Sequence, residues 1–280
     1  MSTRVGLALA LSIATTVRAQ GSDSTKRTII PRDTADAGEH QTLFSRRDAV
    51  MAAGFGALTI AMFPADRHFA ESLQDPEIQA NRFLGRVATS VEQVTSPGAF
   101  IIGGALYSIG RFGGHKDIED LGWHGTESVL LASGVTFVLK GVIGRARPYA
   151  AGDTNPHDFR FLHGFQSADR QSFPSGHTTA AFAAASSVTS EIARMWPAAT
   201  WYAGPALYGG ATLVGLSRMY HNNHWASDVV LGAAIGTFSG LKVVRYSHAH
   251  PDNVIDRIIM AATVVPDLRG GGTVQFTVQQ

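Results

Sequence analysis

Three short clusters of polar residues in the second half of the chain have the composition of a phosphate-binding site. They supply three cations, two histidines, a hydroxyl, a carboxylate and a glycine turn. The clusters are Lys140 with Arg147-Pro148, then Pro174-Ser175-Gly176-His177, then Ser217-Arg218 with His224 and Asp228. Fixed cations and backbone amides suit phosphoryl oxygens, which carry the charge of the transition state. A histidine can serve as the covalent nucleophile. The inventory therefore predicts phosphoryl transfer to histidine without a metal.

The first cluster pairs two basic residues around the end of a predicted helix. Lys140 lies within the apolar run VTFVLKGVIG, where an unpaired ammonium group would be costly to bury. Arg147 follows seven residues later, so a continuous helix would present both side chains on one face. Pro148 disfavours helical geometry in the residue before it and so holds Arg147 at the helix end. A solvated basic face is the alternative for such a pair, but the surroundings of Lys140 favour ligand binding.

The second cluster has the pattern of a glycine turn that leads into a helix. Gly176 permits a close approach of the backbone to a ligand, and the predicted helix starts at about His177. The N-terminus of a helix offers free N–H groups and partial positive charge to an anion. We expect Ser175 to cap this helix or to donate its hydroxyl to a phosphate oxygen. The alternative is that Ser175 is only a cap and His177 a surface residue.

The third cluster connects two predicted helices. Arg218 ends the first helix, and His224 begins the second. Asp228 follows His224 by four residues and is predicted to lie on the same helix face. Its carboxylate would accept the Nδ1 proton of His224 and leave Nε2 free as a nucleophile. In isolation, an ordinary polar connection between helices is an equal alternative.

The order and spacing of the three clusters resemble the three-part signature of the type 2 phosphatidic acid phosphatase and vanadium haloperoxidase superfamily. The resemblance covers roughly residues 45 to 250. It implies that His224 attacks phosphorus and forms a phosphohistidine, with its ring oriented by Asp228. His177 would protonate the leaving oxygen, and water would then hydrolyse the intermediate. By the same resemblance, the phosphate oxygens are held by Lys140, Arg147, Arg218, the Ser175 hydroxyl and the Gly176 N–H. Neither a metal nor another cofactor is expected.

The resemblance implies a hydrolase, specifically a phosphatase that acts on a phosphate monoester or a pyrophosphate. The substrate would be a lipid phosphate or a soluble ester. One alternative is a vanadate-dependent haloperoxidase, in which the same residues hold vanadate, although the Arg147-Pro148 pairing is typical of the phosphatase form. An inactive envelope protein is another, but all three clusters are intact. The net charge of +1 disfavours nucleic acid as a partner, and the lack of cysteine excludes a thiol nucleophile.

Helical patterns punctuated by proline and glycine position these clusters. The predicted helices cover residues 49–63, 76–94, 97–112, 126–144, 178–192, 202–216 and 226–244. They predict an all-α bundle of about six core helices within a domain at residues 45–250. The C-terminal tail, 251–280, has a different pattern. Residues 258–265 and 273–278 resemble a short β-hairpin, because Val274, Phe276 and Val278 alternate with polar residues.

The N-terminus resembles an export signal. Residues 1–19 combine Arg4, an apolar run and a cleavage pattern before Gln20, which predicts a signal peptide. An uncut N-terminus, disordered or membrane-inserted, is the alternative. Residues 20–44 are polar without periodicity and predict a disordered, flexible linker. The twin arginines Arg46-Arg47 precede an apolar run and can mark a different export route. Because they lie far from the N-terminus, we favour a first domain helix there, with an export or anchor element as the alternative. The expected location is therefore exported, periplasmic or associated with an envelope membrane.

The hydropathy pattern is compatible with a soluble or membrane-peripheral bundle and with a membrane-embedded one. The mean hydropathy is +0.04, and polar residues or glycines interrupt most apolar runs. We therefore favour a soluble or membrane-peripheral bundle, although residues 202–216 and 229–244 are apolar enough for an embedded one. The expected partners are a phosphorylated lipid or small-molecule substrate and a membrane surface, without nucleic acid. Composition carries no signal for the oligomeric state.

Several further polar residues are weaker candidates. The loop 149–173 joins two clusters and is expected to shape the mouth of the site. Its candidates for substrate contact are His157, Arg160, His163 and Arg170. His221 is interpreted as a solvent-facing loop residue, with a metal pair with His224 as the alternative. No sequence partner is evident for Asp66, His68 or Trp123-His124.

Overall fold

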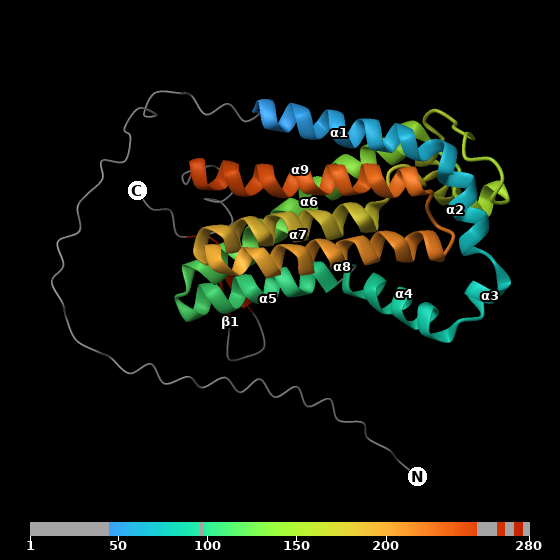
Figure 1. Ribbon diagram of the computed structural model, residues 1–280. Coiled ribbons are helices and arrows are strands. Elements are labelled where there is room, and N and C mark those ends of the chain that lie inside the picture. Colours follow the sequence, from blue (N-terminus) through green and yellow to red (C-terminus); the bar gives the residue numbers. More distant parts are fainter. Residues whose placement is uncertain (1–44, 96–97, 251–261, 267–271, 277–280) are drawn as a thin grey trace, which may run out of the picture. The chain divides into compact units, whose positions relative to one another are not determined.

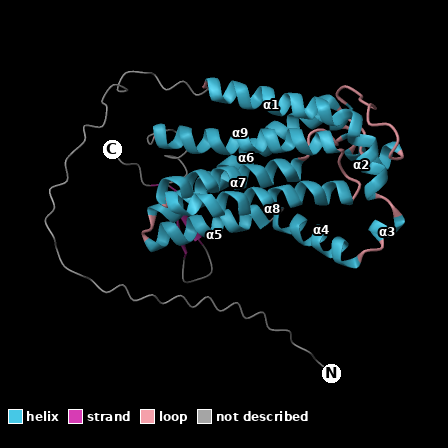
Figure 2. Ribbon diagram, in the orientation of Figure 1, coloured by secondary structure: helices cyan, strands magenta, loops and turns pink. Residues whose placement is uncertain are grey.

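The computed structural model describes residues 45–95, 98–250, 262–266 and 272–276, and the predicted signal peptide and linker lie outside them. Helices dominate the described chain (Figure 2). The α-helices are α1 (Arg46–Met62), α2 (Asp66–Leu73), α3 (Pro76–Gln79), α4 (Arg82–Thr95), α5 (Gly98–Gly113), α6 (Lys116–Ile143), α7 (Gly176–Met195), α8 (Thr200–Tyr220) and α9 (Ala226–Ala249). The predicted all-α bundle is confirmed. Short 3-10 helices connect them: η1 (Phe63–Ala65), η2 (Pro148–Ala151), η3 (His163–Phe165), η4 (Ala168–Arg170) and η5 (Pro197–Ala199).

The tail contains an antiparallel pair of strands, β1 (Ala262–Pro266) and β2 (Gly272–Phe276), in which Ala262 pairs with Phe276 and Pro266 with Gly272. This agrees with the predicted hairpin in type and place. The tail therefore adds a small β element to the mainly helical part of the chain that the structure describes.

Two helix boundaries differ from the prediction. The helix expected at residues 76–94 is divided into α3 and α4, because the Asn81 side-chain oxygen accepts the backbone N–H groups of Phe83 and Leu84 and starts a new helix. Helix α6 begins at Lys116, well before the expected residue 126. The acidic residues of its first turn, Asp117 and Glu119, complement the positive end of the helix dipole.

Helices α7 and α9 form the closely packed centre of the bundle, and they run parallel. Glycines at every fourth position of α9 face α7. A Cβ atom at Gly236 would lie 2.3 Å from the Thr179 carbonyl oxygen, and one at Gly240 would lie 2.7 Å from the Ala183 carbonyl oxygen. The glycines therefore set the distance between the two helices. Helix α1 lies along the other side of α9 (Figure 1), where Lys242 forms an ion pair with Asp48.

The chain reversals bring the polar clusters to one end of the bundle. Helices α6 and α8 run antiparallel to α7, so their C-terminal ends lie beside the first turns of α7 and α9. Helix α6 ends at Gly144, which has a left-handed φ of 62°. A Cβ atom at this position would lie 1.8 Å from the Arg160 carbonyl oxygen, so only glycine fits. The segment between α6 and α7 then folds over this end of the bundle.

Within the part of the chain that the structure describes, three helical segments are long and apolar enough to cross a membrane. They are Arg46–Leu73, Lys116–Ile143 and Ala226–Ala249. This differs from the expectation that polar residues or glycines interrupt most apolar runs. The expected segments were too short, because the first continues through η1 and α2 and the second begins at Lys116.

Candidate active site

Contacts between backbone and side chains join all three polar clusters. A Cβ atom at Gly176 would lie 3.5 Å from Cε of Lys140, which places the first cluster against the second. The Arg147 guanidinium donates to the Asn223 side-chain oxygen at 2.9 Å and so reaches the third cluster. The Ser175 N–H donates to the Asp228 carbonyl at 3.0 Å and joins the second cluster to the third. The structure therefore brings the predicted residues together.

The two basic residues of the first cluster do not share a helix face. Lys140 lies in the last turn of α6, and its Nζ donates to the Gln171 carbonyl. Helix α6 ends before Arg147, whose backbone is extended with φ of −72° and ψ of 154°. Arg147 instead reaches in from the loop and also donates to the Ala168 carbonyl at 3.0 Å. The prediction of one shared face is wrong because Gly144 terminates the helix early.

The second cluster forms the start of α7 as expected. Ser175 is fully buried at the N-cap position, but its side chain makes no capping bond. Its hydroxyl instead lies 2.8 Å from the Thr178 hydroxyl. His177 follows in the first turn and is half-buried. Burial and the positive charges of Lys140 and Arg147 lower the pKa of His177.

His224 is buried just before α9, and its ring is held by the backbone. Its Nδ1 lies 2.7 Å from the Ser172 carbonyl oxygen, which accepts the Nδ1 proton. This fixes the tautomer whose Nε2 carries the free lone pair. The expected direct bond to Asp228 is absent, because the nearer Asp228 oxygen is 3.6 Å from Nδ1. Burial, reinforced by the Lys140 charge, lowers the pKa of His224 to about 3, so the ring is neutral.

Asp228 positions His224 indirectly, through hydrogen bonds to Trp225 and Ser172. Its Oδ2 accepts the Trp225 backbone N–H at 2.8 Å and the Ser172 hydroxyl at 2.5 Å. Trp225 follows His224, and Ser172 supplies the carbonyl that holds its ring. Fully buried, the carboxylate also accepts from Arg145 at 2.5 Å. Asp228 therefore orients the histidine through a shared network.

Sequence reasoning missed Arg145, the fully buried cation at the centre of this network. Its guanidinium donates to Asp228, to Asp66 at 2.7 Å and to the Pro156 carbonyl. It also lies 4.8 Å from the centre of the Phe63 ring. Asp66, which had no evident sequence partner, is therefore bound to Arg145. Since the two residues are 79 positions apart, no local pattern reveals the pair.

Sequence reasoning also missed Glu92 of α4, a carboxylate among residues expected to bind phosphate. Its Oε1 pairs with the Arg218 guanidinium and lies 4.0 Å from Nε2 of His177. Its Oε2 lies 2.8 Å from Nδ1 of His221. His221 thus pairs with Glu92, while Nδ1 of His224 faces the Ser172 carbonyl. This arrangement does not match the metal pair considered for the two histidines.

The loop candidates mainly support the loop itself. Arg170 forms a two-pronged pair with Asp158, at 2.7 and 2.8 Å, which lowers the pKa of the Asp158 carboxyl. His163 contacts the Phe161 carbonyl, and the exposed His157 ring stacks near Phe63. Arg160 is exposed and makes a long ion pair of 3.7 Å with Asp158. Their contacts favour a role in shaping the mouth.

The site combines a buried neutral histidine with cations, a hydroxyl and a helix N-terminus, the donor set of an oxyanion-binding enzyme. Residues 122–252 match the model of the PAP2 superfamily. This match includes every predicted site residue and confirms the resemblance drawn from the three clusters.

Two known proteins are similar to this chain. The lipid A 1-phosphatase of Porphyromonas gingivalis is 35% identical over 112 residues, which is 40% of this chain and 22% of that protein. The chain thus spans about a fifth of the length of this curated relative. The crystal structure of a transmembrane PAP2-type phosphatidylglycerolphosphate phosphatase from Bacillus subtilis aligns with a TM-score of 0.52 at 21% identity. That alignment covers 73% of this chain and 98% of the other, and it shows a shared fold.

Proposed function

We propose that this protein is a metal-independent phosphatase of lipid phosphates that works through a phosphohistidine at His224. The observation that carries the proposal is the burial, neutral charge and fixed orientation of the His224 ring. The ring is buried and neutral, and its Nδ1 is held by the Ser172 carbonyl, so Nε2 is available as a nucleophile. Lys140 and Arg147 lie close enough for their charges to act on the ring. The PAP2 match supports the same reaction class.

In the first step, Nε2 of His224 attacks phosphorus as the bond from phosphorus to the leaving oxygen breaks. His177, which takes up a proton when the negative charge of the bound phosphate offsets Lys140 and Arg147, transfers this proton to that oxygen and becomes neutral. In the second step, neutral His177 takes a proton from water, and the resulting oxygen attacks the phosphohistidine. Inorganic phosphate leaves, and His224 regains its lone pair. The phosphate oxygens are held throughout by Lys140, Arg147, Arg218, the Ser175 hydroxyl and the Gly176 N–H.

An apolar cavity beside the site favours a lipid over a soluble ester. The cavity has a volume of about 420 Å³ and is lined almost wholly by apolar side chains of α4 to α8. Val91 of its lining directly precedes Glu92, and Val214 lies one helical turn before Arg218. An acyl or prenyl chain bound there would present its phosphate to the cations. Both similar proteins are named as phosphatases of lipids.

Exposed apolar side chains support a bundle embedded in a membrane. Ile60 of α1 is 71% exposed and Phe112 of α5 is 70% exposed. A water-soluble bundle is expected to expose less apolar surface than this. Trp196, Trp201 and Tyr202 are exposed at the connection between α7 and α8, where aromatic side chains suit a membrane interface. We infer a membrane location in place of the soluble or peripheral bundle favoured by hydropathy. Export to the envelope remains part of the proposal through the predicted signal peptide.

The proposal is tested by phosphate release from detergent-purified full-length protein. The panel contains phosphatidate, a prenyl diphosphate, a lipid A phosphate and a soluble phosphate ester, each with and without a chelator. We expect release from at least one lipid, unaffected by the chelator and abolished in His224→Ala. His115→Ala is the matched control and should keep full activity, because His115 is exposed just before α6, at the other end of that helix from Lys140. Equal release by wild type and His224→Ala would refute the mechanism, and peroxide-driven halide oxidation with vanadate would favour the haloperoxidase alternative.

A further inference from the structure

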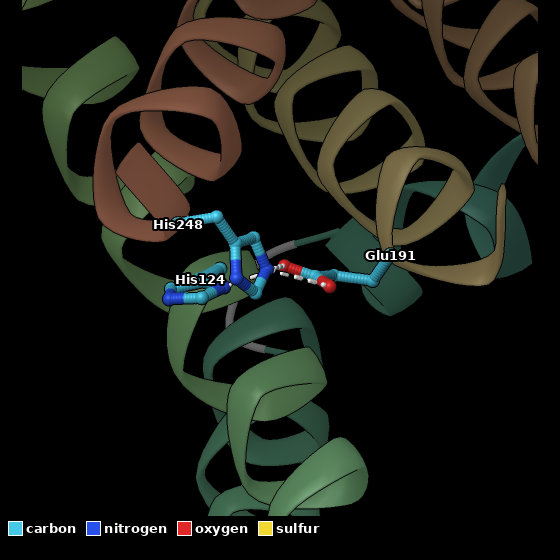
Figure 3. Close-up of side chains that lie close together, drawn as sticks. All are labelled: His124, Glu191 and His248. Carbon is cyan, nitrogen blue, oxygen red and sulfur yellow. Dashed lines mark hydrogen bonds and ion pairs between the residues drawn. The ribbon is translucent and has the colours of Figure 1, made fainter. Parts of the chain in front are cut away.

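A second cluster of titratable side chains lies at the opposite end of the bundle from the candidate active site. His124 of α6, Glu191 of α7 and His248 of α9 point toward one another (Figure 3). Nδ1 of His124 is 2.6 Å from Oε1 of Glu191, and Nε2 of His248 is 2.8 Å from the same oxygen. The second carboxylate oxygen lies 3.1 Å from Nε2 of His248. Three helices therefore direct two imidazoles and one carboxylate to a common point.

This cluster places a carboxylate where little water reaches it. His124 and Glu191 are each 2% exposed, and His248 is 21% exposed. A buried carboxylate must be hydrogen-bonded, paired with a cation or bound to a metal. Arg194 lies 3.8 Å from Glu191 but is itself 54% exposed, so solvent screens its charge. A divalent cation between the three side chains would supply the compensation directly.

We propose that His124, Glu191 and His248 bind a zinc ion. Imidazole nitrogen and carboxylate oxygen are preferred zinc ligands, with bonds of about 2.0 to 2.2 Å. The three donor atoms lie within 4.8 Å of one another, so one ion can reach all of them. The partial exposure of His248 leaves one side of the site open to water as the fourth ligand. Asp120, one helical turn before His124 on the same face of α6, is placed to support that ligand.

The ion would be structural and would take no part in phosphoryl transfer. Lys140 follows His124 by 16 positions in α6, which corresponds to roughly 24 Å along the helix. Its ligands would join α6, α7 and α9, the helices that also carry or flank the candidate active site. The ligands are 67 and 57 residues apart in the sequence, so no local spacing reveals them.

The test measures metal content and binding in the full-length protein purified in detergent. Elemental analysis should find about one equivalent of zinc per chain. After removal of the metal with a chelator, cobalt(II) should bind one equivalent and give the strong visible absorption of a tetrahedral site. Zinc should raise the Tm of the metal-free protein until one equivalent is bound. Phosphate release should not depend on the added zinc.

Two variants make the test specific. His248→Ala should lose the bound zinc and the cobalt absorption. His250→Ala, which changes an exposed histidine two residues away, should keep both. If His248→Ala fails to fold, the cobalt spectrum and zinc titration of the wild type still test whether the cluster binds zinc. Wild-type protein that holds no zinc and binds neither metal stoichiometrically would overturn the proposal and leave a hydrogen-bonded His–Glu–His cluster. Equal binding by wild type and His248→Ala would also overturn it.

Discussion

At the scale of single residues, the neutral state of His224 connects the chemistry of the site to the stability of the fold. The buried His224 ring has a pKa of about 3 and stays neutral above that pH. In the unfolded chain the same side chain has its ordinary pKa of 6.5. Between these values the unfolded state binds one more proton than the native state. The His224 contribution to stability is therefore complete above pH 6.5 and is lost as the pH falls toward 3.

This linkage predicts how the thermal stability depends on pH. The wild-type Tm should fall more steeply than that of His224→Gln as the pH is lowered from about 6.5 to 4, because the variant lacks the titrating ring. Differential scanning calorimetry of both proteins in the same detergent measures this difference. Parallel Tm curves over that range would show that His224 is not held neutral by burial.

Glu92 is a second residue whose charge has a measurable consequence. Its carboxylate pairs with Arg218, so phosphate must compete with it for this cation. Glu92→Gln should therefore strengthen inhibition by inorganic phosphate roughly tenfold, equivalent to about 1.4 kcal/mol. The matched control is Glu71→Gln, which removes an exposed carboxylate paired with Arg67. Unchanged or weaker phosphate inhibition in Glu92→Gln would show that Glu92 does not compete with the substrate.

The residues proposed for the site came from sequence alone, and the structure brings them together, whereas their supporting partners were not predicted. Local patterns, such as the apolar run around Lys140 and the turn at Gly176, indicate chemistry within a few positions. Arg145 acts on Asp228 across 83 positions, and Glu92 acts on Arg218 across 126. Such pairs depend on how helices pack, which one sequence does not display. The role of Asp228 was misjudged for the same reason, because Ser172 comes from another segment.

At the scale of elements, the contact between α7 and α9 determines the geometry of the site. Gly236→Ala would push a methyl group against the Thr179 carbonyl and should lower the free energy of unfolding by about 1 to 3 kcal/mol. Gly209→Ala on α8 is the control, since a Cβ atom there has no neighbour within 4 Å, and it should be neutral or stabilising by up to about 1 kcal/mol. Denaturation curves compare the two. Equal effects would mean that α7 and α9 do not depend on this glycine.

Helix type was easier to predict than helix ends. Apolar periodicity located α5, α7, α8 and α9 to within a few residues. The early start of α6 was missed because its first turns are polar and glycine-containing. The predicted end at residue 144 agrees with the stop at Gly144, which follows the ordinary preference for glycine after a helix C-terminus. The expectation that Pro148 holds Arg147 at this helix end was wrong, because the helix has already stopped.

At the scale of the whole molecule, the proposed membrane location makes a prediction about fractionation. Full-length protein expressed with its N-terminus should remain in the membrane fraction after carbonate or high-salt washing and should require detergent for release. The long apolar segments and the exposed apolar side chains are the physical reason. Quantitative immunodetection in each fraction measures the outcome. Recovery of active protein in the detergent-free supernatant would instead support the soluble or peripheral bundle.

The central claim is that phosphoryl transfer proceeds through His224. Rapid acid-free quenching during turnover of a lipid phosphate, followed by mass spectrometry of the digested protein, tests it most directly. We expect a phosphoryl group on the peptide that contains His224, with fragmentation placing it on that ring. We also expect the adduct to accumulate in His177→Ala when a substrate with a good leaving group is supplied, because the acid is then dispensable while hydrolysis is slowed. A phosphorylated residue other than His224, or full turnover by His224→Ala, would show that His224 is not the nucleophile.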